Sequence, residues 1–400
     1  MIGPTDHCPR PRHPALSLTV LGIAAGLAAG CTTQPQATPE TTAPVAAVET
    51  PEIDLETEFL IGPSKVRELG YRIDHQARTF PEADSGVKRL AVLGDSAFVL
   101  DGRNFLTRLR RTDGHRVWRI PVADPLDDIH GITYLPDDEL VLLMAGAHLL
   151  ILDDDTGSMV EKQDLGQIAS TAPVVFGPVL IYGARNGQLV WHSFEVGYQW
   201  RGYQISSTIR LNPLLVGEAI AVVASDGTVM VLDAGSATAM WEKRLLSGVD
   251  ASPVAGDDLL YIAGLDQYVW ALNLQTGRTA WRYLSEAPLA CPPALVDDRL
   301  YQHIPTEGLV CFAARPADAP GGKIVWSTPG VQGQVIGKHG NRLMVWDDRE
   351  ARMSLIDAER GAVMTTVDLP GVRHLVMSTI DSGDLYAAGD DGRVIRLVPR

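Results

Sequence analysis

The sequence has 400 residues, of which 46% are hydrophobic, and it carries a formal net charge of −15. A chain of this length and apolar content can build a large core. Its excess of 49 acidic over 34 basic residues argues against a nucleic-acid groove or a surface for anionic lipid.

Residues 1–31 are predicted to be a lipoprotein signal peptide. Arg10 and Arg12 give a positive start, and Ala15–Ala29 is an apolar stretch of 15 residues, which is short for a membrane-spanning helix. The segment ends in Ala-Ala-Gly-Cys, which resembles a bacterial lipobox. The resemblance implies acylation of Cys31 as the mature N-terminus and, from Thr32 after it, an outer-membrane location. An ordinary cleaved signal or an uncleaved anchor is the alternative.

Residues 32–52 are predicted to be a disordered tether. This segment of 21 residues contains six Thr, four Pro, four Ala and three Glu. Such a composition cannot bury enough apolar surface to fold by itself. The remaining residues, 53–400, are interpreted as one folded domain.

That domain is built from a repeat of about 40 residues. The repeat is marked by prolines at a constant spacing of 40, namely Pro173, Pro213, Pro253 and Pro293. It is also marked by hairpin turns at spacings of 40, 40 and 41, namely Asn186-Gly187, Asp226-Gly227, Asp266-Gln267 and Glu307-Gly308. No run of the sequence shows the apolar spacing of a helical repeat. A period of 40 with short apolar strands is typical of propeller blades.

The unit at residues 249–290 shows the pattern best. Leu259–Ala263 and Tyr268–Leu272 are rich in strand-forming residues and read as a hairpin. Thr276-Gly277 then turns the chain into Arg278–Tyr283, which contains Trp281. Because a single four-stranded meander cannot bury either of its faces, it needs neighbours of the same kind.

Eight such units are predicted. Their first three strands fall roughly within 90–110, 130–153, 172–195, 212–233, 252–274, 292–313, 333–357 and 374–398. The last unit lacks a fourth strand before the chain ends, and Tyr71–Phe80 is a spare strand at the other end of the domain. Pairing Tyr71–Phe80 beside Val394–Val398 would close the ring and remove its open edges. We therefore expect an all-β, eight-bladed propeller of four-stranded antiparallel blades; seven blades is the alternative if the first unit is misassigned.

The segment Tyr268–Trp281 resembles the repeat of the pyrroloquinoline-quinone-like propeller family. In that family a tryptophan of the last strand wedges between neighbouring blades. The residues that match this position are Trp200, Trp241, Trp281 and Trp326, and Trp118 lies in the corresponding strand of an earlier unit. The family includes quinoprotein dehydrogenases and the lipoprotein propeller subunit of the outer-membrane β-barrel assembly machinery. Fold alone does not choose between these functions.

The residues argue against quinone catalysis. Quinoproteins of this family hold their cofactor in the central channel with carboxylates and a calcium ion, and many carry adjacent cysteines. No two cysteines are adjacent here. The innermost strands are aliphatic instead, at Val174-Val175, Leu214-Leu215-Val216, Val254-Ala255 and Ala294-Leu295-Val296. We expect no catalytic residue and no cofactor.

Other candidate sites have simpler explanations. Asp153–Gly157 resembles a calcium loop but lacks the glycine and the closing glutamate of an EF-hand, so a solvated turn is expected. No metal site is predicted from the scattered histidines His130, His303, His339 and His374. Cys291 and Cys311 fall on strands separated by a third one, which favours two buried thiols over a disulfide between them.

Paired aspartates recur at one turn, between the first and second strands of three units. They are Asp137-Asp138, Asp257-Asp258 and Asp297-Asp298. The general preference of turns for Asp is one explanation. The functional interpretation is an acidic face for a basic protein partner.

The leading hypothesis is a non-enzymatic, monomeric, lipid-anchored propeller of the cell envelope that binds protein partners. The family resemblance implies a role with outer-membrane β-barrel assembly components, on the periplasmic side of the outer membrane. The alternatives are a small quinoprotein or other channel-site enzyme, and a module that binds envelope polysaccharide.

Overall fold

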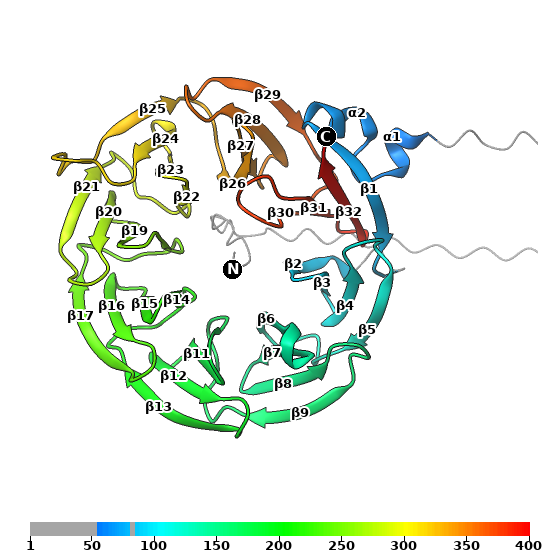
Figure 1. Ribbon diagram of the computed structural model, residues 1–400, viewed down its shortest axis with the longest axis horizontal. Helices are drawn as coiled ribbons and strands as arrows, with labels where there is room; N and C mark the ends of the chain where they lie inside the picture. The colour runs from blue at the N-terminus through cyan, green and yellow to red at the C-terminus, as the bar shows by residue number, and fades with distance from the viewer. Residues whose placement is uncertain (1–53, 81–84) are drawn as a thin grey trace, which may run out of the picture. The chain divides into compact units, whose positions relative to one another are not determined.

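The computed structural model describes residues 54–80 and 85–400, so the predicted signal peptide (1–31) and tether (32–52) lie outside the described residues. The described chain forms eight four-stranded antiparallel sheets, arranged as the blades of a propeller (Figure 1). The all-β prediction and the count of eight blades are confirmed.

The strands of each blade follow one another in the chain. Blade 1 contains β2 (Val87–Leu93), β3 (Ser96–Asp101), β4 (Phe105–Arg110) and β5 (Arg116–Pro121). Blade 2 contains β6 (Ile129–Leu135), β7 (Leu140–Ala145), β8 (His148–Asp153) and β9 (Met159–Asp164). Blade 3 contains β10 (Val174–Phe176), β11 (Val179–Gly183), β12 (Gln188–Ser193) and β13 (Tyr198–Gln204). Blade 4 contains β14 (Leu214–Val216), β15 (Ala219–Val223), β16 (Thr228–Asp233) and β17 (Thr238–Arg244).

The second half of the ring repeats the pattern. Blade 5 contains β18 (Val254–Ala255), β19 (Leu259–Ala263), β20 (Tyr268–Asn273) and β21 (Thr279–Leu284). Blade 6 contains β22 (Ala294–Val296), β23 (Arg299–Ile304), β24 (Gly308–Ala313) and β25 (Ile324–Thr328). Blade 7 contains β26 (Gln334–His339), β27 (Arg342–Asp347), β28 (Arg352–Asp357) and β29 (Val363–Asp368). Blade 8 contains β30 (His374–Met377), β31 (Leu385–Ala388), β32 (Arg393–Pro399) and β1 (Tyr71–Arg78).

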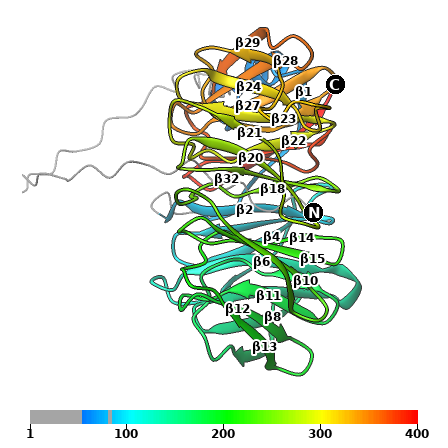
Figure 2. The same cartoon turned by 90° about the vertical axis from the view of Figure 1, so that its left-hand side faces the viewer.

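The core lies between neighbouring blades. The first strand of each blade faces the centre of the ring and the fourth lies on the rim, as the face-on view shows (Figure 1). Figure 2 shows the same ring from the side. The middle strands are almost fully buried; all five residues of β19, for example, are buried. Each apolar cluster joins two adjacent blades, such as Val231 of blade 4 with Ile262 of blade 5. Each sheet therefore buries both faces only because it has a neighbour on each side.

The ring closes as the sequence predicts. Strand β1 pairs antiparallel with β32, from Tyr71 opposite Pro399 to Arg78 opposite Arg393. Two short helices, α1 (Leu55–Glu58) and α2 (Pro63–Glu68), precede β1 and were not anticipated. Pro63 suits the first turn of α2 because its missing N–H would have no helical partner there. Among the described residues, no helix has the length and apolar character needed to cross a membrane.

A β-bulge interrupts the pairing of the third and fourth strands in blades 1 to 7. The skipped residues are Val117, Val160, Trp200, Met240, Ala280, Val325 and Met364. Such a bulge re-aims the side chains around it. The tryptophan that wedges between blades follows the skipped residue, as Trp241 and Trp281 do.

The assignment of Trp200 to the wedge position is therefore wrong by one residue. Trp200 is the bulged residue of blade 3 and is 37% exposed, and Arg201 occupies the wedge register. The indole that fills the space between blades 3 and 4 belongs to Trp191 of β12, which is fully buried. The matches at Trp241, Trp281 and Trp326 are confirmed by their contacts with the next blade.

Candidate functional site

The first-to-second-strand turns and the third-to-fourth-strand turns lie on one face of the ring. Backbone hydrogen bonds join them within each blade: the N–H of Leu274 donates to the carbonyl of Asp258 at 2.8 Å, and that of Ala314 to Asp298 at 3.0 Å. The N–H of Asp154 likewise donates to the carbonyl of Glu139, next to Asp138. The six predicted aspartates are thus exposed residues on a common face.

Three of these aspartates have positive partners, and we call them the paired aspartates (Asp258, Asp297 and Asp298). The guanidinium of Arg315 lies 2.7 Å from the carboxylate of Asp298 and 3.5 Å from that of Asp258, bridging two blades. The Nζ of Lys338 lies 2.7 Å from the carboxylate of Asp297. This hydrogen bond raises the pKa of Lys338 above its usual range. The negative charge of the paired aspartates is therefore partly neutralised.

The other three have no such partner, and we call them the open aspartates (Asp137, Asp138 and Asp257). None of them forms an ion pair with another described residue, and all three are exposed. Asp137 and Asp138 lie in a short 3₁₀ turn, η2 (Pro136–Asp138), which leaves both carboxylates in solvent. The six predicted aspartates are therefore not equally exposed to a partner as free charges, and those without an ion pair lie on blades 2 and 5.

The aspartate-rich segment Asp153–Gly157 is a turn, as expected. One carboxylate oxygen of Asp153 accepts hydrogen bonds from the N–H of Thr156 at 2.8 Å and from its hydroxyl at 2.6 Å. These bonds hold the pKa of Asp153 below its usual range. Asp154 differs because it is buried and lies 2.9 Å from the guanidinium of Arg108. That ion pair fixes the turn to blade 1.

Four of the eight innermost strands have the aliphatic character that was predicted for them. The short first strands β10, β14, β18 and β22 contain the expected aliphatic residues. The four singled-out histidines do not converge: His374 bonds the carbonyl of Val87 at 2.7 Å, and His339 packs against Tyr71 with ring centroids 5.5 Å apart. Within residues 54–80 and 85–400, no group of three or more side chains suited to a metal ion comes together.

The two cysteines of blade 6 do not bond each other. Cys311 is a free, buried thiol, and burial raises its pKa to about 12. Cys291 is not among the free thiols, so the expectation of two free thiols is confirmed for Cys311 alone. The expectation that this pair is not bridged is confirmed, although Cys291 lies before β22 and not on it.

A charged network at the ring closure was missed in the sequence. Asp384 lies 2.7 Å from Arg396 and 3.2 Å from Arg111, and Arg396 also lies 3.2 Å from Asp74 of β1. These residues come from blade 8, blade 1 and the closing strand, so the network joins the two ends of the domain. A sign of this network in the sequence is the composition of residues 67–119, which contain eleven Lys and Arg against seven Asp and Glu.

Comparison with known proteins agrees with this architecture. Residues 175–312, in blades 3 to 6, match the model of a family described as outer membrane protein assembly factor BamB. The crystal structure of BamB from Moraxella catarrhalis superimposes with a TM-score of 0.63 at 19% sequence identity, covering 82% of this chain and 97% of that one. The computationally designed Ika8 protein gives a TM-score of 0.65 at 14% identity, covering 80% of this chain and 98% of that one.

No curated protein matches the chain in sequence. At these identities the two structures show a shared fold and nothing further. Together with the family model, they confirm that this chain resembles the pyrroloquinoline-quinone-like propeller repeat family, and BamB within it.

Proposed function

We propose that this chain is a non-enzymatic, lipid-anchored envelope propeller that binds protein partners during outer-membrane protein assembly. The observation that carries this proposal is the match of blades 3 to 6 with the family model named for an outer-membrane assembly factor. The anchor, the partners and the absence of catalysis are parts of the proposal.

The placement of the polar residues supports a binding role. Exposed acids gather on one turn face, whereas the first strands of blades 3 to 6 are short and aliphatic. Groups on loops held by a rigid scaffold are well placed for recognition. Unneutralised carboxylates raise the association rate of a basic partner more than they raise its affinity.

The lipid anchor is tested by metabolic labelling with a radioactive fatty acid. The parent protein should carry the label and fractionate with outer membranes, whereas a Cys31→Ser variant should carry none. Equal labelling of the two proteins would contradict acylation at Cys31.

The turn face is tested by affinity capture from solubilised membranes. One variant replaces the open aspartates (Asp137→Asn, Asp138→Asn, Asp257→Asn). A matched control replaces the paired aspartates (Asp258→Asn, Asp297→Asn, Asp298→Asn). Both variants change the net charge by the same amount, but only the first removes carboxylates that have no cation beside them.

The open-aspartate variant should recover less of the β-barrel assembly proteins, and the deficit should be largest below about 0.1 M salt. The control should lose less. Two outcomes would refute partner binding by the open aspartates: unchanged capture by both variants, or the same loss of capture in each. Absence of assembly proteins from the parent's own capture would refute the proposed role itself.

A further inference from the structure

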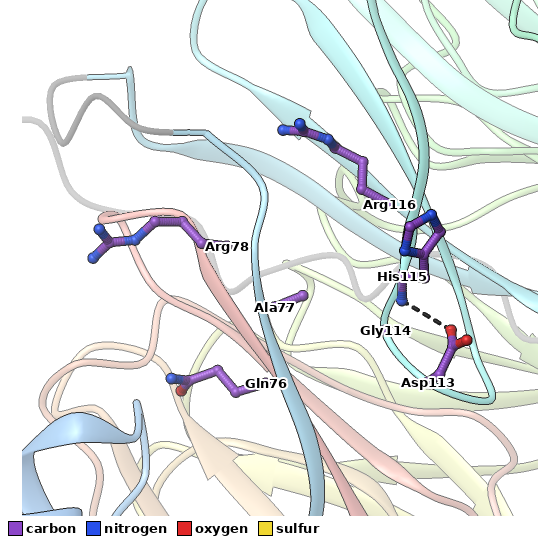
Figure 3. A pocket seen from close by; sticks show the side chains of 7 residues that line it. All are labelled: Gln76, Ala77, Arg78, Asp113, Gly114, His115 and Arg116. Carbon is purple, nitrogen blue, oxygen red and sulfur yellow. Dashed lines mark hydrogen bonds between the residues drawn. The ribbon is translucent and has the colours of Figure 1, made fainter.

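A polar groove runs along the rim where the ring closes (Figure 3). It has a volume of about 540 Å³ and lies between β1 of blade 8 and the β4–β5 turn of blade 1. It is lined by Gln76, Ala77, Arg78, Asp113, Gly114, His115 and Arg116. We call it the seam groove.

Two uncompensated cations line the seam groove. Arg78 and Arg116 are both exposed, and neither side chain makes an ion pair or hydrogen bond with any residue in the described part of the chain. Figure 3 shows the Arg116 side chain on the blade 1 side of β1 and the Arg78 side chain on the opposite side of that strand. The groove's one acid, Asp113, lies 2.9 Å from Arg110 outside the groove and accepts the N–H of His115 at 2.9 Å. The groove therefore presents positive charge.

This charge contrasts with the rest of the molecule. Residues 67–119 contain eleven Lys and Arg against seven Asp and Glu, whereas residues 120–400 contain twenty against thirty-five. An acidic chain is repelled by most of this surface and attracted to the segment that forms the closure. Such a contrast directs an approaching anion to one place.

The shape of the seam groove suits an extended polypeptide. Strand β1 is the last strand of its sheet, so only one of its edges is paired, with β32. The turn at Gly114 covers this strand beside His75, and the groove continues past it along Gln76–Arg78. An extended segment can lie along a strand edge, and carboxylates form paired hydrogen bonds with arginine.

We propose that the seam groove docks an extended, acidic segment of a partner protein, with its carboxylates on Arg78 and Arg116. This binding surface is separate from the open aspartates, which would receive a basic partner. The inference goes beyond the proposed function and does not depend on the outer-membrane role. A strand edge is an argument for a peptide over a lipid headgroup, since a headgroup has no backbone to align with it.

The test compares two double variants of the full-length protein in neutral detergent. One is Arg78→Gln with Arg116→Gln. The control is Arg201→Gln with Arg278→Gln, two exposed arginines of blades 3 and 5 that also lack an ion pair with any described residue. Both variants remove two positive charges. The probe is a fluorescent peptide of about twelve residues that alternates Glu and Thr, and its twin has Gln in place of Glu. Binding is followed by fluorescence anisotropy at about 20 mM and 150 mM salt.

The parent should bind the Glu peptide more tightly than the Gln peptide. The groove variant should bind the Glu peptide about tenfold more weakly, and the control less than about twofold. Equal weakening in both variants, or no preference for Glu, would overturn the proposal. So would loss of dihexanoyl-phosphatidylglycerol binding in the groove variant with peptide binding intact. Capture through the open aspartates is measured separately, so either idea can fail alone.

Discussion

Tryptophans join neighbouring blades through one repeated backbone position. The indole N–H donates to the carbonyl of the residue that follows the third strand of the next blade. The pairs are Trp118–Asp154, Trp191–Ala234, Trp241–Leu274, Trp281–Ala314 and Trp326–Ala358, at 2.6 to 3.1 Å. In blade 2 the amide of Gln163 makes the equivalent bond to Phe194 at 2.6 Å. A buried indole thus adds both apolar area and a satisfied donor to each interface.

Blade 3 provides a direct test of this arrangement. Trp191→Ala should lower the free energy of unfolding by about 3–5 kcal/mol, because it leaves a cavity and an unpaired carbonyl at Ala234. Trp200→Ala should cost less than about 1 kcal/mol, since that side chain is partly in solvent. Urea denaturation of the two variants measures the difference. A larger loss for Trp200→Ala would mean that Trp200 is the wedge after all.

The Thr-Gly turn of the repeat has its explanation in the same interface. Gly277 has φ +68°, and a Cβ placed there would lie 2.7 Å from the Trp241 ring of the preceding blade. The glycine permits both the left-handed backbone and the close approach of the indole.

Gly277→Ala should therefore destabilise the propeller by more than the cost of a left-handed backbone at an alanine. Gly217 is the control, with φ +59° and nothing within 4 Å of its Cβ position. Gly217→Ala should cost about 1 kcal/mol, from the left-handed conformation only. Gly277→Ala should cost about 1–3 kcal/mol more, from overpacking against Trp241. Equal melting temperatures of the two variants would exclude steric contact as the reason for this glycine.

At the scale of elements, turns and strands were predictable because they are local. In the turns Asp226-Gly227 and Asp391-Gly392, the glycine takes the left-handed conformation, at φ +87° and +79°. The bulge before each wedge residue was not predictable, because one extra residue leaves the amino-acid composition of a strand almost unchanged. The apolar Trp200 and Trp191 look alike in sequence, and only the pairing of Trp191 with Arg201 separates them.

The candidate face was predictable only in part, for a related reason. The aspartate pairs could be placed from the repeat, since each lies at the same turn. Their counter-ions could not, because Arg315 is 57 residues from Asp258 in sequence and Lys338 is 41 residues from Asp297. Contacts between side chains of different blades depend on the geometry of the ring, which the repeat does not encode residue by residue.

Ring closure depends on β1 and on the residues just before it. Ile61, Val66 and Leu69 are buried in the cluster that also contains Leu375 and Leu397 of blade 8. A deletion of residues 32–53 should leave the melting temperature nearly unchanged, because that segment has a composition unable to form a core. A deletion of 32–80 should expose the free edge of β32 and cause aggregation, measurable by light scattering.

A deletion of residues 32–61 separates the packing effect from the strand effect. It keeps β1 but removes the buried Leu60 and Ile61, so it should lower the melting temperature without exposing the strand edge. If the 32–80 deletion instead gives a monomeric protein with the parent's melting temperature, pairing of β1 with β32 does not hold the ring closed.

At the scale of the whole molecule, one ion-pair network lies at the ring closure. Asp384 contacts two arginines from blades 1 and 8, and this network connects the two ends of the ring.

Aspartates with strongly hydrogen-bonded carboxylates, such as Asp153 and Asp357, have pKa values below the usual range. Their stabilising effect is present above the unfolded pKa of about 4 and is lost only below it. Acid sensitivity at milder pH must come from other groups.

We expect two buried histidines to cause such sensitivity. His192 and His303 are each at least nine-tenths buried, and burial lowers the pKa of both below 6.5. The folded protein then binds fewer protons than the unfolded chain once the pH falls below about 6.5, so stability decreases from there towards the folded pKa. We expect the parent's melting temperature to fall between pH 7.5 and 5.0. The accompanying loss of unfolding free energy is limited to about 1.4 kcal/mol per histidine per pH unit. His192→Gln with His303→Gln should make that fall smaller, because glutamine stays neutral at both pH values. If the fall is as steep in the double variant as in the parent, the buried histidines are not the cause, and the closure network is the next group to test.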